Sequence, residues 1–125
     1  MHEALPRLQR GLTIVQPEMG HTGVSQFVAI GRLASAFHAR VIPHATIGTG
    51  IFLAASLHAS AALPNVTWHE YQHSVFDSNL KLLETTMRCE RGFYHLPEGP
   101  GLGVQPSELF WKYAMKSTEY ATATT

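Results

Sequence analysis

Short β-branched segments alternate with longer helical segments along the first part of this chain, and this alternation constrains its fold most strongly. Buried strands are predicted at residues 12–15, 40–42 and 66–68, where β-branched side chains gather. Helices are predicted at residues 4–10, 24–37 and 47–63. A helix–strand alternation of this kind predicts an α/β fold whose parallel strands are joined by right-handed crossovers.

The pattern changes after residue 72. Residues 73–83 are polar with a short apolar patch, and residues 88–96 are predicted as one extended segment. Residues 97–103 contain two prolines and three glycines, which predicts a rigid, turn-rich loop. Ser107 is the predicted N-cap of a last helix that runs to Ala114, and a frayed end is expected over residues 119–125.

Composition narrows the class of protein. The 125 residues are 45% hydrophobic and 14% charged, which is typical of one globular unit. Nine basic side chains balance nine acidic ones, so no nucleic-acid or membrane-surface partner is expected. The uncharged stretch from Val41 to Trp68 is interrupted by Gly, Pro and His, and we expect it inside an α/β core rather than in a bilayer.

The cysteine content and the start of the chain bear on the compartment. Cys89 is the only cysteine, so no internal disulfide can form, as expected for a reducing cytoplasm. The first residues show no basic region followed by an apolar segment, and no signal peptide is expected. The predicted localisation is cytoplasmic.

Three ionisable residues follow the predicted strands at equal intervals. His44 lies 26 residues after Glu18, and Glu70 lies 26 residues after His44. Residues just beyond the carboxyl ends of parallel strands face one common crevice, so an imidazole is expected between two carboxylates. A carboxylate that holds one ring nitrogen of His44 raises the basicity of the other, as a general base requires. The other carboxyl group, if protonated, can donate to a substrate oxygen that becomes negative. Taken singly, a glutamate after a strand is often only a solvated loop residue, and a histidine after a proline often caps a helix.

The remaining histidines and the cysteine give weaker signals. His21 lies in the predicted loop 20–23 on the crevice side, where it is a candidate for substrate contact. His58 is predicted to pack inside a helix, and Cys89 to be a structural thiol. The other histidines have no partner at metal-ligand spacing, namely His38, His69, His73 and His95. Gly48-Thr49-Gly50 lacks the further glycine and acidic residue of a dinucleotide-binding loop.

Four segments, taken in order, resemble a known family. They are Val-Gln-Pro-Glu at 15–18, Val-Ile-Pro-His-Ala at 41–45, Ala-Ala-Leu-Pro-Asn at 61–65 with Glu-Tyr at 70–71, and Leu-Pro-Glu-Gly-Pro-Gly-Leu-Gly-Val at 96–104. Together they resemble the C-terminal part of the mandelate racemase and muconate lactonizing enzyme group of the enolase superfamily. The resemblance extends from about residue 4 to residue 111.

The resemblance implies a partial (β/α)8 TIM-type barrel. Residues 1–86 would form the C-terminal portion of the barrel with its sixth to eighth strands. Residues 87–125 would form a C-terminal tail that packs on the capping domain. The capping domain and the early barrel strands are expected to be absent from this chain.

The resemblance also assigns roles to the three residues. His44 falls at the position of the catalytic His on the seventh strand, and Glu18 at that of the Asp which orients it. Because Glu18 is one methylene longer, the orientation of His44 is an open question. Glu70 falls at the position of the eighth-strand acid that hydrogen-bonds the substrate carboxylate.

The activity implied is removal of a proton α to a carboxylate, assisted by Mg²⁺. The metal ligands of the family lie on earlier strands, and only Glu3 precedes Glu18 as an acid, so the Mg²⁺ ligands are not expected in this chain. The loop at 18–23 is most similar to that of sugar-acid dehydratases. We therefore expect part of a dehydratase for a sugar-acid or hydroxy-acid substrate, inactive alone and homo-oligomeric at full length. The alternatives are a racemase or cycloisomerase, a non-catalytic remnant or interaction module, and a small independent binding domain.

Overall fold

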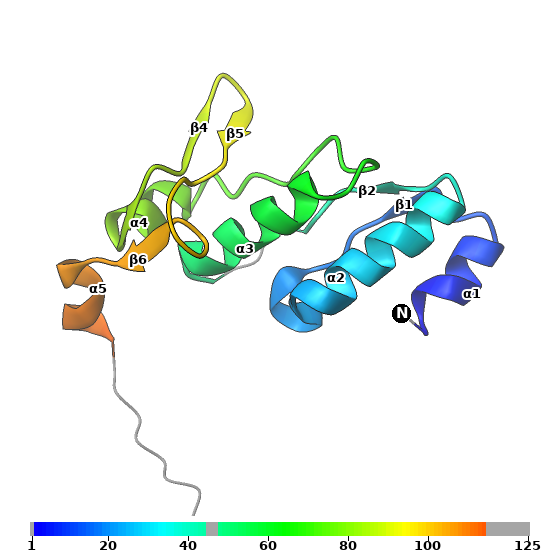
Figure 1. Ribbon diagram of the computed structural model, residues 1–125, viewed down its shortest axis with the longest axis horizontal. Coiled ribbons are helices and arrows are strands. Elements are labelled where there is room, and N and C mark those ends of the chain that lie inside the picture. Colours follow the sequence, from blue (N-terminus) through cyan, green and yellow to red (C-terminus); the bar gives the residue numbers. More distant parts are fainter. Residues whose placement is uncertain (1, 45–47, 115–125) are drawn as a thin grey trace, which may run out of the picture.

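The computed structural model describes residues 2–44 and 48–114 and shows a mixed α/β fold (Figure 1). Helices and strands alternate first, and shorter elements follow. The elements are α1 (Ala4–Gln9), β1 (Ile14–Val15), α2 (Met19–Ala36), β2 (Arg40–Val41), α3 (Gly50–Ala61), α4 (Phe76–Lys81), β3 (Leu83–Thr85), β4 (Arg88–Glu90), β5 (Phe93–His95), β6 (Val104–Pro106) and α5 (Glu108–Tyr113). The predicted order of the first five elements is confirmed.

The predicted parallel pairing is also confirmed for the first two strands. In β1 and β2, Ile14 lies opposite Arg40 and Val15 opposite Val41. Residues 66–68, predicted as a third strand, form only a single parallel bridge, between Val66 and Val41. The backbone hydrogen bonds explain why no regular third strand forms. The segment from Asn65 to Glu70 faces only Val41 to Pro43 across the ladder, so it bulges outward and forms no regular strand.

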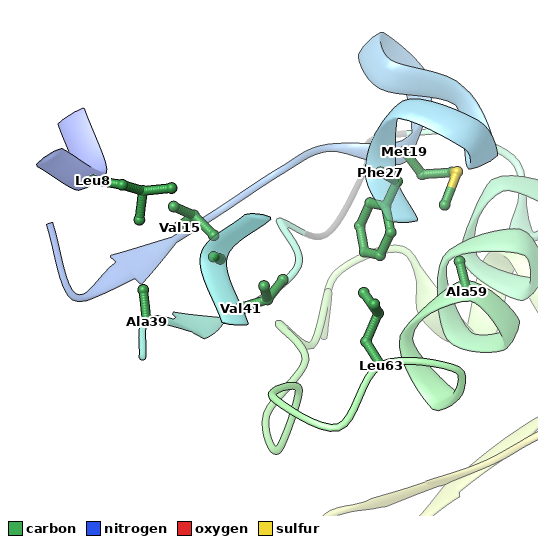
Figure 2. Packing of buried hydrophobic residues seen from close by; sticks show 9 residues of the cluster. Leu8, Val15, Met19, Phe27, Ala39, Val41, Ala59 and Leu63 are labelled. Atoms are coloured by element: carbon green, nitrogen blue, oxygen red, sulfur yellow. The ribbon is translucent and has the colours of Figure 1, made fainter. Parts of the chain in front are cut away.

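The core lies between the parallel strands, α2 and α3. Phe27 and Val41 are fully buried there, and Leu63 packs beside them below α3 (Figure 2). A second, smaller cluster joins α3 to the later elements and contains Ala54, Leu57, Leu83 and Met87. The two clusters bury opposite sides of α3, which explains why this helix carries small and apolar residues around its whole circumference.

Helix α2 begins earlier than predicted. Residues 20–23, predicted as a loop, form a helical turn after Glu18, which stands at the N-cap position. The Thr22 hydroxyl donates to the Glu18 carbonyl at 2.8 Å and closes this turn. Gly23, with φ of +65°, then bends the chain before the main part of the helix. His21 therefore lies in a helical turn and not in a loop.

The second half contains more regular structure than the sequence indicated. The polar segment 73–83 contains α4, and the predicted extended segment 88–96 folds as the antiparallel hairpin β4–β5. Its turn residues Arg91 and Gly92 both have positive φ, as a tight hairpin of this type requires. The β3–β6 pair was not predicted.

Within the described residues, no helix is long and apolar enough to cross a membrane.

The prediction that Ser107 caps the last helix, α5, is confirmed. The Ser107 side chain accepts a hydrogen bond from the Phe110 backbone N–H at 3.2 Å. The expected start of the third helix at residue 47 and the expected frayed end at 119–125 lie outside the described residues.

Two glycines of the 97–103 loop form a matched pair for a stability test. Gly101 and Gly103 have φ of +64° and +65°, so a side chain at either site meets the same backbone strain, about 1–2 kcal/mol. A Cβ at Gly103 would lie 2.8 Å from the Glu98 carbonyl oxygen, whereas a Cβ at Gly101 would meet nothing within 4 Å. We expect Gly103→Ala to lower the free energy of unfolding more than Gly101→Ala, measured by urea denaturation. Equal losses would contradict this packing.

Candidate active site

The backbone places Glu18, His44 and Glu70 side by side. The His44 N–H donates to the Pro17 carbonyl at 3.1 Å, and the Glu70 N–H donates to the Pro43 carbonyl at 3.2 Å. Glu18 and His44 also form a parallel bridge just beyond β1 and β2. Glu18 and His44 therefore sit just beyond the ends of β1 and β2, and Glu70 lies beside them at the end of the bulged segment, in the order expected from their spacing.

His44 and Glu18 are in direct contact. Nδ1 of His44 lies 3.1 Å from Oε2 of Glu18. The Glu18 side chain is 25% exposed and that of His44 is 48% exposed, so the pair is partly desolvated while the ring stays accessible. The longer side chain of Glu18, where the resemblance implies Asp, thus still reaches the ring.

Glu70 faces the other ring nitrogen. Its Oε2 lies 3.8 Å from Nε2 of His44, and its side chain is 44% exposed. This separation exceeds that of a good hydrogen bond, so the Nε2 edge of the ring is not closed off by Glu70. The imidazole stands between two carboxylates with one ring edge held and the other edge open.

His21 extends the cluster on the Glu18 side. Its Nε2 lies 3.6 Å from Oε1 of Glu18, and its side chain is 80% exposed. The two residues are three apart on the turn that begins α2, which brings their side chains to the same side. The structure therefore brings together all four residues singled out from the sequence.

The contacts of His44 define what its ring can do. An ionised carboxylate only accepts hydrogen bonds, so Nδ1 of His44 carries the proton when it bonds Glu18. In the neutral ring, Nε2 is then the basic atom. Each ring nitrogen of His44 thus faces a carboxylate, Nδ1 that of Glu18 and Nε2 that of Glu70.

Metal binding is not provided by the described residues. Across residues 2–44 and 48–114, no group of three or more His, Cys, Asp or Glu side chains is arranged to hold a metal ion. The Mg²⁺ that the resemblance implies does not fit this set of side chains. No chemical step is therefore assigned to a metal here.

Two residues near Glu70 were missed by the sequence reasoning. His69 Nδ1 lies 2.8 Å from the Glu70 carbonyl oxygen, and the Tyr94 hydroxyl donates to the same oxygen at 3.2 Å. The sequence assigns no role to His69, because it has no partner at metal-ligand spacing. No sequence signal points to it, since its other partner, Ser56, is 13 residues away on α3.

An imidazole between two carboxylates, just beyond the ends of two parallel strands, defines a candidate acid–base site in an α/β protein. The enolase C-terminal domain-like family profile matches residues 1–109. The chain belongs to this family, in the mandelate racemase/muconate lactonizing enzyme group of the enolase superfamily.

Individual relatives are similar over most of this chain but over a minor part of their own length. D-Galactonate dehydratase of Ralstonia pickettii is 31% identical over 105 residues, 78% of this chain and 27% of that protein. D-Galactarolactone cycloisomerase of Agrobacterium fabrum is 30% identical over 74% of this chain and 26% of its own. A solved Sinorhizobium meliloti structure, named provisionally as an isomerase, is 58% identical with a TM-score of 0.85, over 89% of this chain and 30% of its own. The chain thus spans less than a third of these relatives.

Burial of His69 predicts a pH-dependent stability. Desolvation lowers the pKa of His69 below its ordinary value of 6.5, against a raising effect of Glu70. The unfolded chain therefore binds a proton near pH 6.5 that the folded chain binds only at lower pH. We expect the free energy of unfolding to fall as the pH drops from 7.5 to 5.5, and to fall less in His69→Gln.

Urea denaturation at the two pH values measures this difference. The exposed His73, changed to Gln, controls for the loss of an imidazole elsewhere. An equal or larger loss of stability in His69→Gln than in the unchanged chain would show that His69 is not the group responsible.

Proposed function

We propose that this chain supplies the acid–base residues of an enzyme that removes the proton α to a carboxylate in a sugar acid. The observation that carries the proposal is that Glu18 lies 3.1 Å from one nitrogen of the His44 ring while Glu70 faces the other nitrogen at 3.8 Å. Family membership supports it, because relatives of this chain include enzymes named for acid-sugar substrates.

Each residue has a distinct role in the proposed reaction. His44 takes the substrate α-proton at Nε2, the ring atom that Glu18 leaves unprotonated. Glu18 fixes the ring orientation and stabilises the imidazolium that forms. Glu70, on the open side of the ring, is the proposed partner of the substrate carboxylate, to whose oxygen it donates a hydrogen bond if its carboxyl group is protonated. His21, next to Glu18 and strongly exposed, contacts the substrate from the other side.

We further propose that the parallel segments are the last strands of a (β/α)8 barrel. The family match and the share of the relatives that the chain covers support this assignment. In this proposal, residues 1–86 belong to the barrel and residues 87–125 form the tail that packs on a capping domain. The β3–β6 pair joins the two parts, because Leu83–Thr85 lies before the boundary and Val104–Pro106 after it.

Dehydration is the proposed outcome of the reaction. Seven of eight curated relatives that are 30–31% identical to this chain are named D-galactonate dehydratase. In dehydration, the electron pair left at the α-carbon forms a double bond to the β-carbon as the β-hydroxyl group leaves, and the proton that His44 took up is returned to that group, which departs as water. Such an enzyme would act on a small acid sugar in the cytoplasm, with Mg²⁺, typical of the superfamily, bound by residues outside the described set.

Isomerisation is the second candidate. The 58% identical Sinorhizobium meliloti protein carries a provisional isomerase name, and one curated relative is a cycloisomerase. The same proton abstraction at His44 begins both reactions, and the outcomes differ in whether a water molecule is lost. A mass spectrum of the product therefore separates the two.

A chimeric enzyme tests the proton abstraction. In the chimera, this chain replaces the matching segment of the Sinorhizobium meliloti protein, and that protein supplies the rest of the fold. Deuterium incorporation from D₂O into a panel of sugar acids and hydroxy acids is followed by proton NMR. We expect exchange in the chimera and a loss of about 10²- to 10⁴-fold in His44→Asn, because a general base contributes that much.

Two further variants separate the roles. Glu18→Gln should lower kcat less than His44→Asn, since it disturbs ring orientation but leaves the base in place. His21→Gln should raise KM with little change in kcat, as expected for uniform substrate binding. A folded chimera that fails to exchange substrates which the Sinorhizobium meliloti parent exchanges would favour a non-catalytic remnant or interaction module.

A further inference from the structure

Two side chains contact the backbone carbonyl of Glu70, one from the neighbouring residue and one from β5. His69 Nδ1 lies 2.8 Å from its oxygen, and the Tyr94 hydroxyl, from β5, lies 3.2 Å from it. The Glu70 N–H donates to Pro43 at the same time. Both backbone polar groups of Glu70 are thereby fixed, although its carboxylate is on an exposed side chain.

The hydrogen bonds of His69 determine its tautomer. A carbonyl oxygen only accepts, so Nδ1 of His69 carries the proton. Nε2 then accepts the hydroxyl proton of Ser56, whose Oγ lies 2.8 Å away. Ser56 is in α3 and only 2% exposed, so it is a rigid anchor. Burial lowers the pKa of His69, which favours the same neutral form.

Tyr94 supports the same arrangement from the hairpin. Its ring packs edge-on against His69, with the ring centroids 5.5 Å apart. Burial raises the pKa of Tyr94, so its hydroxyl group keeps its proton and remains a donor. The hairpin thus contacts the Glu70 carbonyl oxygen directly through Tyr94, and helix α3 is linked to it through Ser56 and His69.

We propose that Ser56, His69 and Tyr94 are positioning residues that hold the Glu70 backbone so that its carboxylate faces His44. The bulged segment from Asn65 to Glu70 has few ladder hydrogen bonds of its own, so these three side chains replace them. We call Ser56, His69 and Tyr94 together the clamp. Its catalytic role rests on the proposed function, but the clamp itself is a property of the folded chain.

Amide variants of His69 test the clamp. Asn places a donor near the position of Nδ1 and can keep the bond to the Glu70 carbonyl, whereas Gln reaches toward Ser56 instead. The readout is the set of His44 ring resonances in an NMR spectrum of the ¹⁵N,¹³C-labelled chain without substrate. We expect His69→Gln to reproduce the shifts caused by Glu70→Gln, and His69→Asn to restore the wild-type positions.

A matched pair on α3 controls for general loss of stability. Ser56→Ala should shift the His44 resonances in the same direction as His69→Gln. Ser60→Ala should not, because the Ser60 hydroxyl is also buried but has no hydrogen-bond partner among the described residues. Unchanged His44 resonances in His69→Gln, or equal shifts in the Asn and Gln variants, would overturn the proposal. Because no substrate is present, the clamp can pass this test even if the proposed proton abstraction fails.

Discussion

The register of the parallel backbone ladder is the constraint on which the site depends. Val15 and Val41 lie opposite each other and are buried, and Pro17 and Pro43 repeat this burial two residues later. Side chains on a strand alternate between faces, so a slip of one residue would exchange buried and exposed positions along the strand. The same slip would move His44 away from Glu18. The core that fixes the register therefore also fixes the site.

Much of this arrangement could be predicted from the sequence. The 26-residue spacing of Glu18, His44 and Glu70 reflects one strand–helix unit per interval, and β-branched residues mark where each unit begins. Parallel topology then requires the strand ends to meet on one side. Ser107 was identifiable as a helix cap because its role depends only on residues three positions away. Local signals and a repeated unit carry these predictions.

Other features depend on contacts between distant segments. The bulge between Asn65 and Glu70 reduces a predicted strand to one bridge, and β-branched composition carries no sign of it. The β3–β6 pair joins segments about twenty residues apart, neither of which has a strong strand pattern. His69 gains its importance from Ser56 and Tyr94, which are brought near it only by tertiary packing. Such partners cannot be inferred from spacing along the chain.

The central claim is that Glu18 holds Nδ1 of His44 and leaves Nε2 as the basic atom. Long-range ¹H–¹⁵N correlation spectra of the labelled chain, recorded where the His44 ring is neutral, measure this directly. The account predicts a protonated Nδ1 and an unprotonated Nε2 in the unchanged chain, with that preference lost in Glu18→Gln. A ring protonated at Nε2, or one that exchanges freely between the two forms, would contradict it.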